Sequence, residues 1–359
     1  MAKEKTKSED KGKMTFEEFG NAINKALKKE IVYSPGKSRG VFDRPRSSSG
    51  VLSLDIALYG GYPTGCNYLV YGNESSGKSY LMMKRMAEIT NREDNDLNKV
   101  FLEDPENSFD VVWAEKIGIN LSNIQVSRCE YAEQSMDLVV GAIASGLFAG
   151  VFLDSLAALS PKVEVDGGME DKTMGGNAYL IGKMYRKIET SKAEAFRLNK
   201  KFFPDFYAIN QFREKIGVMF GDPRTLPGGK AQHFFSHVKL EIKVVEKIIV
   251  NDISMGTLHE IFVAKNKTAP PYSKATFKLI NNGANAGTVD NILILFNMLV
   301  DSGVIQKSGS WYNQGDTKLG QGAEKASDFL RKMSGEELNG LLDLSMEGND
   351  SIDKVEFRF

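Results

Sequence analysis

The feature that most constrains this chain is a glycine-rich turn between a short apolar run and a helical pattern. Residues 72–79 read Gly-Asn-Glu-Ser-Ser-Gly-Lys-Ser, which fits G-x-x-x-x-G-K-[ST] at every required position. Residues 68–71 form the apolar run, and residues 80–87 read as the opening of a helix. A chance match in a flexible turn has no need for Lys-Ser at that offset, so the sequence predicts a phosphate-binding P-loop and a nucleoside triphosphate.

The residue types of this turn suit a triphosphate. Backbone N–H groups of the turn and of the helix N-terminus point at an anion. Lys78 would reach the β- and γ-phosphates, and the Ser79 hydroxyl would bind Mg²⁺. The nucleotide-binding residues predicted here are Gly72, Glu74, Ser75, Ser76, Gly77, Lys78, Ser79 and Tyr80.

Acidic residues follow two other apolar runs. A P-loop protein needs a carboxylate at the end of a neighbouring strand to hold Mg²⁺, and Asp154 after residues 151–153 fits that role better than a helix cap. Hydrolysis also needs a group that orients or deprotonates the attacking water. Glu103, Asp104 and Glu106 follow residues 100–102, and the pattern alone does not choose among them.

A polar pair, Asn210 and Gln211, closes the apolar run 206–209. An amide there can contact the γ-phosphate, although Asn and Gln also simply close turns. Residues 212–229 follow, rich in Gly and Pro, with apolar side chains between basic ones. Long loops inside compact domains are usually functional or disordered. This mixture suits a nucleic-acid strand, whose bases contact apolar groups and whose phosphates contact cations.

Composition narrows the class of protein without choosing the function. The chain has 359 residues and a formal net charge of −1, so any nucleic-acid binding must come from local patches. It has no apolar run of 18 residues and no apolar signal segment at its N-terminus, so we expect no membrane span and no secretion. Its two cysteines cannot form a disulfide framework, and we expect a reduced, cytoplasmic setting.

The pattern along the chain predicts an α/β protein. Thr15 with Glu18 forms a capping box, which predicts a helix start. Apolar runs then alternate with helical patterns, as in βα units around a mostly parallel sheet with helices on both faces. Later strands look antiparallel and joined by short charged turns such as Glu246-Lys247. We expect a disordered tail (1–14), an N-terminal helix and linker (15–50), the core (51–282), a small α+β domain (283–345) and a tail (346–359).

Taken together, these segments resemble the RecA family of DNA recombinases, of the bacterial type. The resemblance covers about residues 47–332. It is most specific in the loop of residues 212–229 and in the Lys-Asn-Lys element at residues 265–267. It implies a RecA-like P-loop ATPase core. The residues that carry it are 72–79, 153–162, 209–221, Pro223, 228–229, 265–267, 309–312 and 319–322.

The resemblance implies an ATP-dependent recombinase that forms a helical filament of its own copies on single-stranded DNA and exchanges strands with duplex DNA. It implies a DNA-dependent ATPase with ATP and Mg²⁺ as cofactors, and recombination mediators as further partners. Two other readings stay open: a RecA-core ATPase without strand exchange, such as a ring helicase or a loader, and a regulatory filament on single-stranded DNA. A ring helicase would be expected to carry a separate domain before the core.

Carried over to this chain, the resemblance assigns roles to single residues. It points to Glu106 as the catalytic base and to Gln211 as the link between the γ-phosphate and the DNA loop. Trp113 falls where the family stacks a tyrosine on adenine, with Asp110 near the same base. Lys265 and Lys267 would reach the triphosphate bound by the adjacent subunit.

The resemblance also assigns two DNA loops, about residues 164–176 and 212–229, and a docking surface between subunits. The residues it assigns to DNA are Met174, Gly175, Arg186, Arg213, Lys215, Ile216, Gly217, Met219, Phe220, Arg224, Gly228 and Gly229. The subunit-interface residues are Phe16, Phe19, Ile23 and Phe234.

The chain departs from the family at several points. Tyr179 stands where the family has a DNA-facing arginine, and Arg224 replaces an acidic residue, so DNA contacts are expected to be redistributed between the loops. The basic segment 190–205, which includes Lys192, reads as a solvated helix face or an added DNA contact. The strongly acidic C-terminal tail of many bacterial members is absent, which suggests a phage-encoded or divergent homologue.

Overall fold

The computed structural model describes residues 14–29, 31–36, 42–168, 170, 176–199, 203–214, 223–347 and 357. The chain forms two compact units, Met1–Pro45 and Arg46–Phe359, and each is described by itself. Apart from Met14 and residues 346, 347 and 357, the two predicted tails lie outside the described residues.

The first unit contains helix α1 (Phe16–Leu27), which begins with the predicted capping box. The Thr15 hydroxyl accepts from the Glu18 N–H at 3.2 Å, and the Glu18 carboxylate accepts from the Thr15 N–H at 2.7 Å. The apolar stripe of this helix is open to solvent, because Phe16 is 87% and Phe19 56% exposed.

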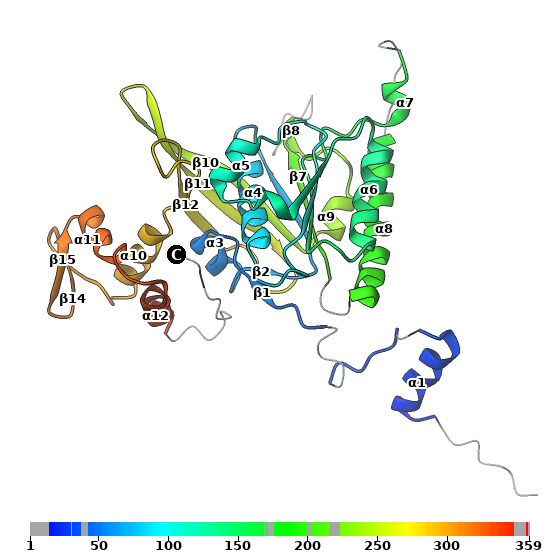
Figure 1. The fold of residues 1–359 in the computed structure, drawn as a ribbon, viewed down its shortest axis with the longest axis horizontal. Helices are drawn as coiled ribbons and strands as arrows, with labels where there is room; N and C mark the ends of the chain where they lie inside the picture. Colours follow the sequence, from blue (N-terminus) through cyan, green and yellow to red (C-terminus); the bar gives the residue numbers. More distant parts are fainter. Residues whose placement is uncertain are drawn as a thin grey trace, which may run out of the picture. The chain divides into compact units, whose positions relative to one another are not determined.

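The second unit is built on an eight-stranded sheet (Figure 1). From β10 to β5 every neighbouring pair is parallel, whereas β10–β11 and β11–β12 are antiparallel. This confirms the expected parallel core with an antiparallel extension. The strands in spatial order are β12 (Lys274–Ile280), β11 (Ile253–Asn266), β10 (Val238–Val250), β3 (Asn67–Gly72), β7 (Asp205–Gln211), β6 (Gly150–Leu153), β4 (Val100–Glu103) and β5 (Ile124–Ser127).

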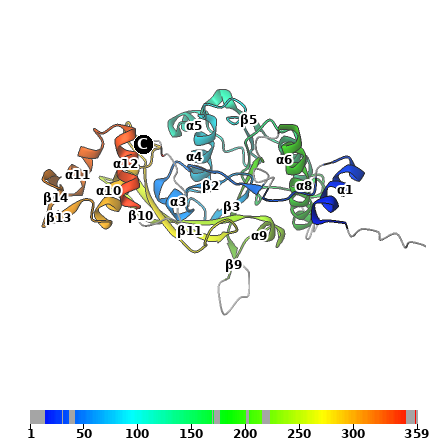
Figure 2. The same ribbon diagram turned by 90° about the horizontal axis from the view of Figure 1, so that it is seen from below.

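Helices cover both faces of this sheet (Figures 1 and 2). Helices α3 (Leu52–Ala57), α4 (Lys78–Thr90) and α5 (Val111–Ile117) pack on one face, and α6 (Ala132–Ala144) and α8 (Gly176–Asn199) on the other. Successive residues of β3 enter opposite cores, as the alternation of a buried strand requires. Shorter elements are β1 (Arg46–Ser47), β2 (Tyr62–Pro63), η1 (Leu121–Asn123), α7 (Lys162–Val165), β8 (Arg213–Glu214), β9 (Arg224–Thr225) and α9 (Ala231–Phe235).

The turn predicted at Glu246-Lys247 is wrong. Both residues lie inside β10, and the chain reverses at Asn251 and Asp252, whose φ angles are 49° and 63°. Positive φ at two central residues is typical of the tight turn that fits the twist of a hairpin, and Asn and Asp tolerate it. The charged pair needs no turn because Glu246 and Lys247 are both exposed to solvent within β10.

A buried polar cluster lies between α4 and the sheet, at the end of the sheet where β7 begins. The buried Arg85 guanidinium donates to the Tyr207 hydroxyl at 2.8 Å and pairs with Asp205 at 3.2 Å. The buried Asp55 carboxylate accepts from the Ser49 N–H at 2.7 Å. These bonds satisfy polar groups that would otherwise be costly to bury.

The C-terminal part of the second unit has a core of its own, to which Leu52 of α3 also contributes. A three-stranded antiparallel sheet lies between its helices in chain order. Across the described residues, no helix combines the length and the apolarity needed to cross a bilayer. The elements are α10 (Asn291–Asp301), β13 (Gln306–Ser308), β14 (Trp311–Gln314), β15 (Thr317–Gln321), α11 (Ala323–Leu330) and α12 (Gly335–Ser345).

Candidate nucleotide site and loop surfaces

The predicted P-loop joins the end of β3 to the start of α4. A Cβ on Gly72 would lie 2.2 Å from the Ile242 carbonyl oxygen, so only glycine fits there. Gly77 caps α4 with φ of 98°, in the left-handed region that glycine tolerates. The first N–H groups of a helix have no acceptor one turn back, so this turn presents free donors to an anion.

Lys78 lies within this turn and is only 5% exposed. Its ammonium donates to the Asn73 carbonyl oxygen at 2.7 Å. Burial lowers the pKa of Lys78, and the charges of Asp154, Glu106 and Glu74 oppose that effect. The lysine therefore lies among the acidic residues that the sequence assigned to the same site.

Asp154 directly follows the end of β6, and its side chain lies near the start of α4. The Ser79 hydroxyl hydrogen-bonds its carboxylate, which brings together the two predicted Mg²⁺ ligands. Burial raises the pKa of Asp154 to about 7, while the Ser79 bond and the Lys78 charge act against the rise. A hydroxyl and one carboxylate are a donor set that fits Mg²⁺, which prefers oxygen ligands and keeps waters and phosphates in its remaining positions.

The three carboxylates after β4 have different surroundings. Glu103 is buried and accepts from the Ser127 and Ser135 hydroxyls. Asp104 is also buried and accepts from the Ser108 N–H at 3.0 Å and the Phe109 N–H at 3.1 Å.

Glu106, in contrast, is exposed. Its carboxylate accepts from the hydroxyl of Ser155, the residue after Asp154. Of the three candidates that the sequence left open, Glu106 is the exposed one, and its carboxylate bonds the residue next to Asp154.

Two further predicted residues lie on either side of the P-loop. Gln211 ends β7 directly opposite Gly72, so it neighbours the turn. The Tyr80 side chain is buried, with its hydroxyl 3.2 Å from the Gly287 carbonyl oxygen. Any contact of Tyr80 with a nucleotide would therefore come from its backbone N–H, in the first turn of α4.

Trp113 and Asp110 lie at the start of α5. Asp110 is the N-cap of this helix and accepts from the Trp113 N–H at 2.7 Å. Trp113 is partly buried and packs against the core that also holds α4. The pair is thus on the same face of the sheet as the P-loop helix.

The lysines near the end of β11 lie apart from this P-loop. Lys265 pairs with Lys239 on β10, which pairs with Leu69 on β3, three positions before Gly72. The Lys265 ammonium donates to the His233 carbonyl at 2.7 Å, and Lys267 lies 5.8 Å from the ring centre of Phe234. Burial, with the charges of Lys267 and Lys239, lowers the pKa of Lys265 to about 8.

The two predicted DNA loops are described only at their ends. Met174, Gly175, Lys215, Ile216, Gly217, Met219 and Phe220 lie outside the described residues. Arg213 is exposed on β8, which pairs with β9 at the other end of the loop. Arg224 on β9 pairs with Glu241 at 3.3 Å and lies 4.6 Å from the Phe212 ring centre.

The C-terminal stem of the second loop is fixed by buried amides. The Asn210 amide donates to the Pro227 carbonyl at 2.9 Å, and the Gln232 amide donates to the Gly229 carbonyl at 3.1 Å. Gly228 and Gly229 both have positive φ, at 91° and 76°. The residue next to Gln211 therefore holds the loop in place from within the core.

Helix α8 carries residues with unlike surroundings. Arg186 is exposed, and Tyr179 is 66% exposed. Lys192 is buried, and its ammonium donates to the Gly65 carbonyl at 3.0 Å and to Asn67 at 2.6 Å. The prediction of a solvated or DNA-contacting Lys192 is therefore wrong, because this side chain ties α8 to the start of β3.

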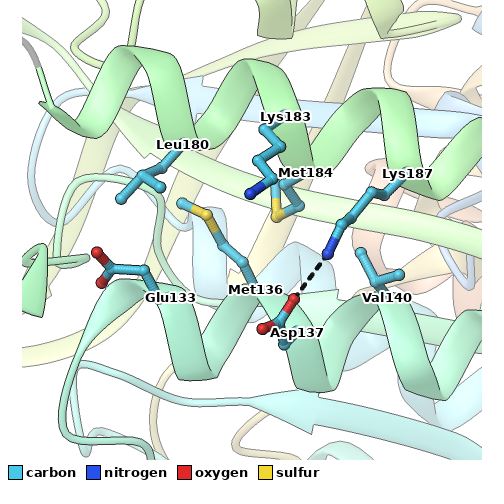
Figure 3. Close-up of a pocket in the computed structure, with 8 residues that line it drawn as sticks. All are labelled: Glu133, Met136, Asp137, Val140, Leu180, Lys183, Met184 and Lys187. Atoms are coloured by element: carbon cyan, nitrogen blue, oxygen red, sulfur yellow. Dashed lines mark hydrogen bonds and ion pairs between the residues drawn. The ribbon is translucent and has the colours of Figure 1, made fainter.

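A shallow pocket lies between α6 and α8, on the opposite face of the sheet from α4 (Figure 3). Within it Lys187 pairs with Asp137 at 3.0 Å. The pocket holds none of the predicted site residues. Its lining is Glu133, Met136, Asp137, Val140, Leu180, Lys183, Met184 and Lys187.

One residue that the sequence did not single out touches the P-loop. His259 of β11 is 2% exposed, and its Nδ1 lies 2.9 Å from the Ser76 carbonyl oxygen. It is 183 residues away in the chain, and a histidine on a strand carries no pattern that would point to this contact.

Comparisons with known proteins match almost the whole described chain. A family model described as the RecA N-terminal domain matches residues 15–286, and one described as the RecA C-terminal domain matches residues 294–336. Protein RecA of Clostridium novyi is 38% identical over 286 residues, which cover 79% of this chain and 77% of that protein. Protein RecA of Bartonella bacilliformis is 36% identical over 311 residues, covering 86% of this chain and 85% of that protein.

Proposed function

The chain belongs to the RecA family, and we propose that it carries out the family's reaction with the residues described above. It is a DNA-dependent ATPase that uses ATP and Mg²⁺, forms filaments on DNA and catalyses recombination. The residue assignment rests on one observation. At the carboxyl ends of the parallel strands, four side chains lie close together: Lys78, Ser79, Asp154 and Glu106.

In the proposed ATP site, the P-loop N–H groups and Lys78 hold the phosphates. Ser79 and Asp154 would hold Mg²⁺, and bound MgATP would supply the phosphoryl group for transfer to water, with ADP as the leaving group. Glu106 takes the proton of the attacking water, with its carboxylate oriented by the Ser155 hydroxyl. Gln211, beside Gly72, responds to the γ-phosphate and transmits its presence to the loop that begins at Phe212.

Lys265 and Lys267 are proposed to act on the nucleotide of the adjacent subunit. Support comes from their distance from their own P-loop along β10 and β3 and from their position beside Phe234, which is 71% exposed. An exposed aromatic ring next to two cations suits a contact between subunits. The ATP site would then be complete only in a filament.

The remaining assignments concern subunit docking, DNA binding and the two domains. Helix α1 docks on the neighbouring subunit through a stripe made of the exposed Phe16 and Phe19 and the half-buried Ile23. The two loops around residues 164–176 and 212–229 contact DNA, and so does the exposed Arg186 of α8. Arg213 is an exposed cation at the start of the second loop. Residues 51–282 form the ATPase core, and residues 283–345 form a separate small domain.

A D-loop assay with ATP and homologous DNA tests strand exchange. We expect joint molecules that depend on ATP and on homology. Filaments that form well on single-stranded DNA but give no joint molecules would instead identify a regulatory filament.

A further inference from the structure

His259 of β11 contacts the P-loop at Ser76 and Gly77. Its ring lies against Gly77, since a Cβ built on Gly77 would be 2.9 Å from His259 Cε1. The ring also stacks on Phe277, with centres 5.0 Å apart and planes at 12°. The imidazole is therefore held in one orientation between β12 and the turn.

The hydrogen bonds of this ring fix its tautomer. The Ser76 carbonyl can only accept, so Nδ1, 2.9 Å away, carries a proton and donates. Nε2 lies 2.8 Å from the Thr257 hydroxyl, which can donate to it. Burial lowers the pKa of His259, so the neutral ring with a proton on Nδ1 satisfies both partners at neutral pH.

Holding the Ser76 carbonyl has a geometric consequence for the next N–H. In a trans peptide the C=O and the following N–H point in opposite directions. A carbonyl directed at His259 therefore directs the Gly77 N–H away from His259. In the part of the chain that the structure describes, the Ser76 hydroxyl is buried without a hydrogen-bond partner, so this hydroxyl does not anchor the turn.

We propose that His259 is a positioning residue of the ATP site, which sets the Ser76–Gly77 peptide so that the Gly77 N–H faces the triphosphate. The proposal rests on the proposed role of the P-loop and adds a residue of β11 to it. Because Gly77 has φ of 98° and no side chain, its peptide would otherwise turn with little steric cost. His259 supplies the constraint that glycine lacks.

Two variants of matched shape separate positioning from packing. Asn and Leu both branch at Cγ, but only Asn has a donor nitrogen where the imidazole has Nδ1. His259→Leu should raise the Kd for ATP about 10- to 100-fold, the effect of losing one well-aimed donor to a charged phosphate. His259→Asn should keep the Kd within about threefold of the wild-type value. Both variants lose the ring stack, so their thermal stability should fall by similar amounts.

An ATP affinity of His259→Leu equal to that of the wild type would overturn the proposal, and so would an equal loss in both variants. Lys78→Ala separates this outcome from failure of the P-loop assignment. If Lys78→Ala abolishes ATP binding and His259→Leu does not weaken it, only the inference about His259 fails. If Lys78→Ala also leaves ATP binding intact, the P-loop assignment itself is wrong.

The tautomer gives a second test that needs no stable Leu variant. The chain has three histidines, so ring-nitrogen NMR of histidine-labelled protein yields three ring systems. The signals that disappear in His259→Asn belong to His259. We expect a protonated Nδ1 in the wild-type protein, and a ring protonated only on Nε2 would overturn the proposal.

Discussion

Glu106→Gln should stop ATP hydrolysis while leaving ATP and DNA binding in place. A glutamine keeps the oxygen that accepts from the Ser155 hydroxyl, so the loop after β4 should hold its shape. What is lost is the ability to take a proton from water. Loss of a positioned general base typically costs 10²- to 10⁴-fold in rate, or about 3–5 kcal/mol in the activation barrier. Glu103 and Asp104 cannot replace it, because both are buried and accept from other groups.

The assay is steady-state ATPase with saturating single-stranded DNA, together with the ATP Kd and the lifetime of the filament. Asp104→Asn is the matched control, because it also neutralises a carboxylate of this segment. Asp104 caps the backbone at Ser108 and Phe109, so its variant should lose about 1–2 kcal/mol of stability but less than tenfold in turnover. Normal hydrolysis by Glu106→Gln, or an equal loss in the control, would refute the assignment of the base.

Three further results are expected. Burial raises the pKa of Asp55 from an ordinary value of 3.8 to about 7, so its stabilising effect is full below about pH 3.8, declines as the pH rises and is lost once the pH has passed about 7. In urea unfolding, the wild-type free energy should therefore fall more than that of Asp55→Asn between about pH 5 and pH 8; parallel pH profiles would show that Asp55 titrates normally. Phe234→Ala should change monomer stability by less than about 0.5 kcal/mol, since the ring is 71% exposed, yet shorten filaments in electron micrographs. Affinity for single-stranded DNA should fall steeply with salt, and Arg213→Ala should reduce the log–log slope by about 1; an unchanged slope would place Arg213 away from the phosphates.

Local sequence patterns were sufficient to predict the strand, turn and helix of the P-loop and to single out Ser79 and Asp154, which the fold brings together. Strand, turn and helix follow one another directly at residues 68–87, and Asp154 directly follows a buried strand. Each signal is contained in a few consecutive residues, so no tertiary information is needed to read it. The capping box of Thr15 and Glu18 is confirmed for the same reason.

Other features depend on contacts between distant segments. The pattern could not choose among three carboxylates, because Glu103 is taken up by Ser127 and Ser135, more than twenty residues away. Lys192 looked like one of several solvated cations until the fold placed Gly65 and Asn67 against it. His259 reaches Ser76 across 183 residues. In each case a side chain's partner, and not its own type, decides its role.

A mixing experiment with Lys78→Ala and Lys267→Ala tests most directly whether the ATP site is shared between subunits. Each variant alone should be inactive in DNA-stimulated hydrolysis, the first for lack of a P-loop lysine and the second for lack of the lysine from its neighbour. In a random 1:1 filament, about a quarter of the head-to-tail interfaces would pair an intact P-loop with an intact Lys267. We predict recovery of about that fraction of wild-type turnover. Mixtures that stay as inactive as the separate variants would show that Lys267 does not act across the interface.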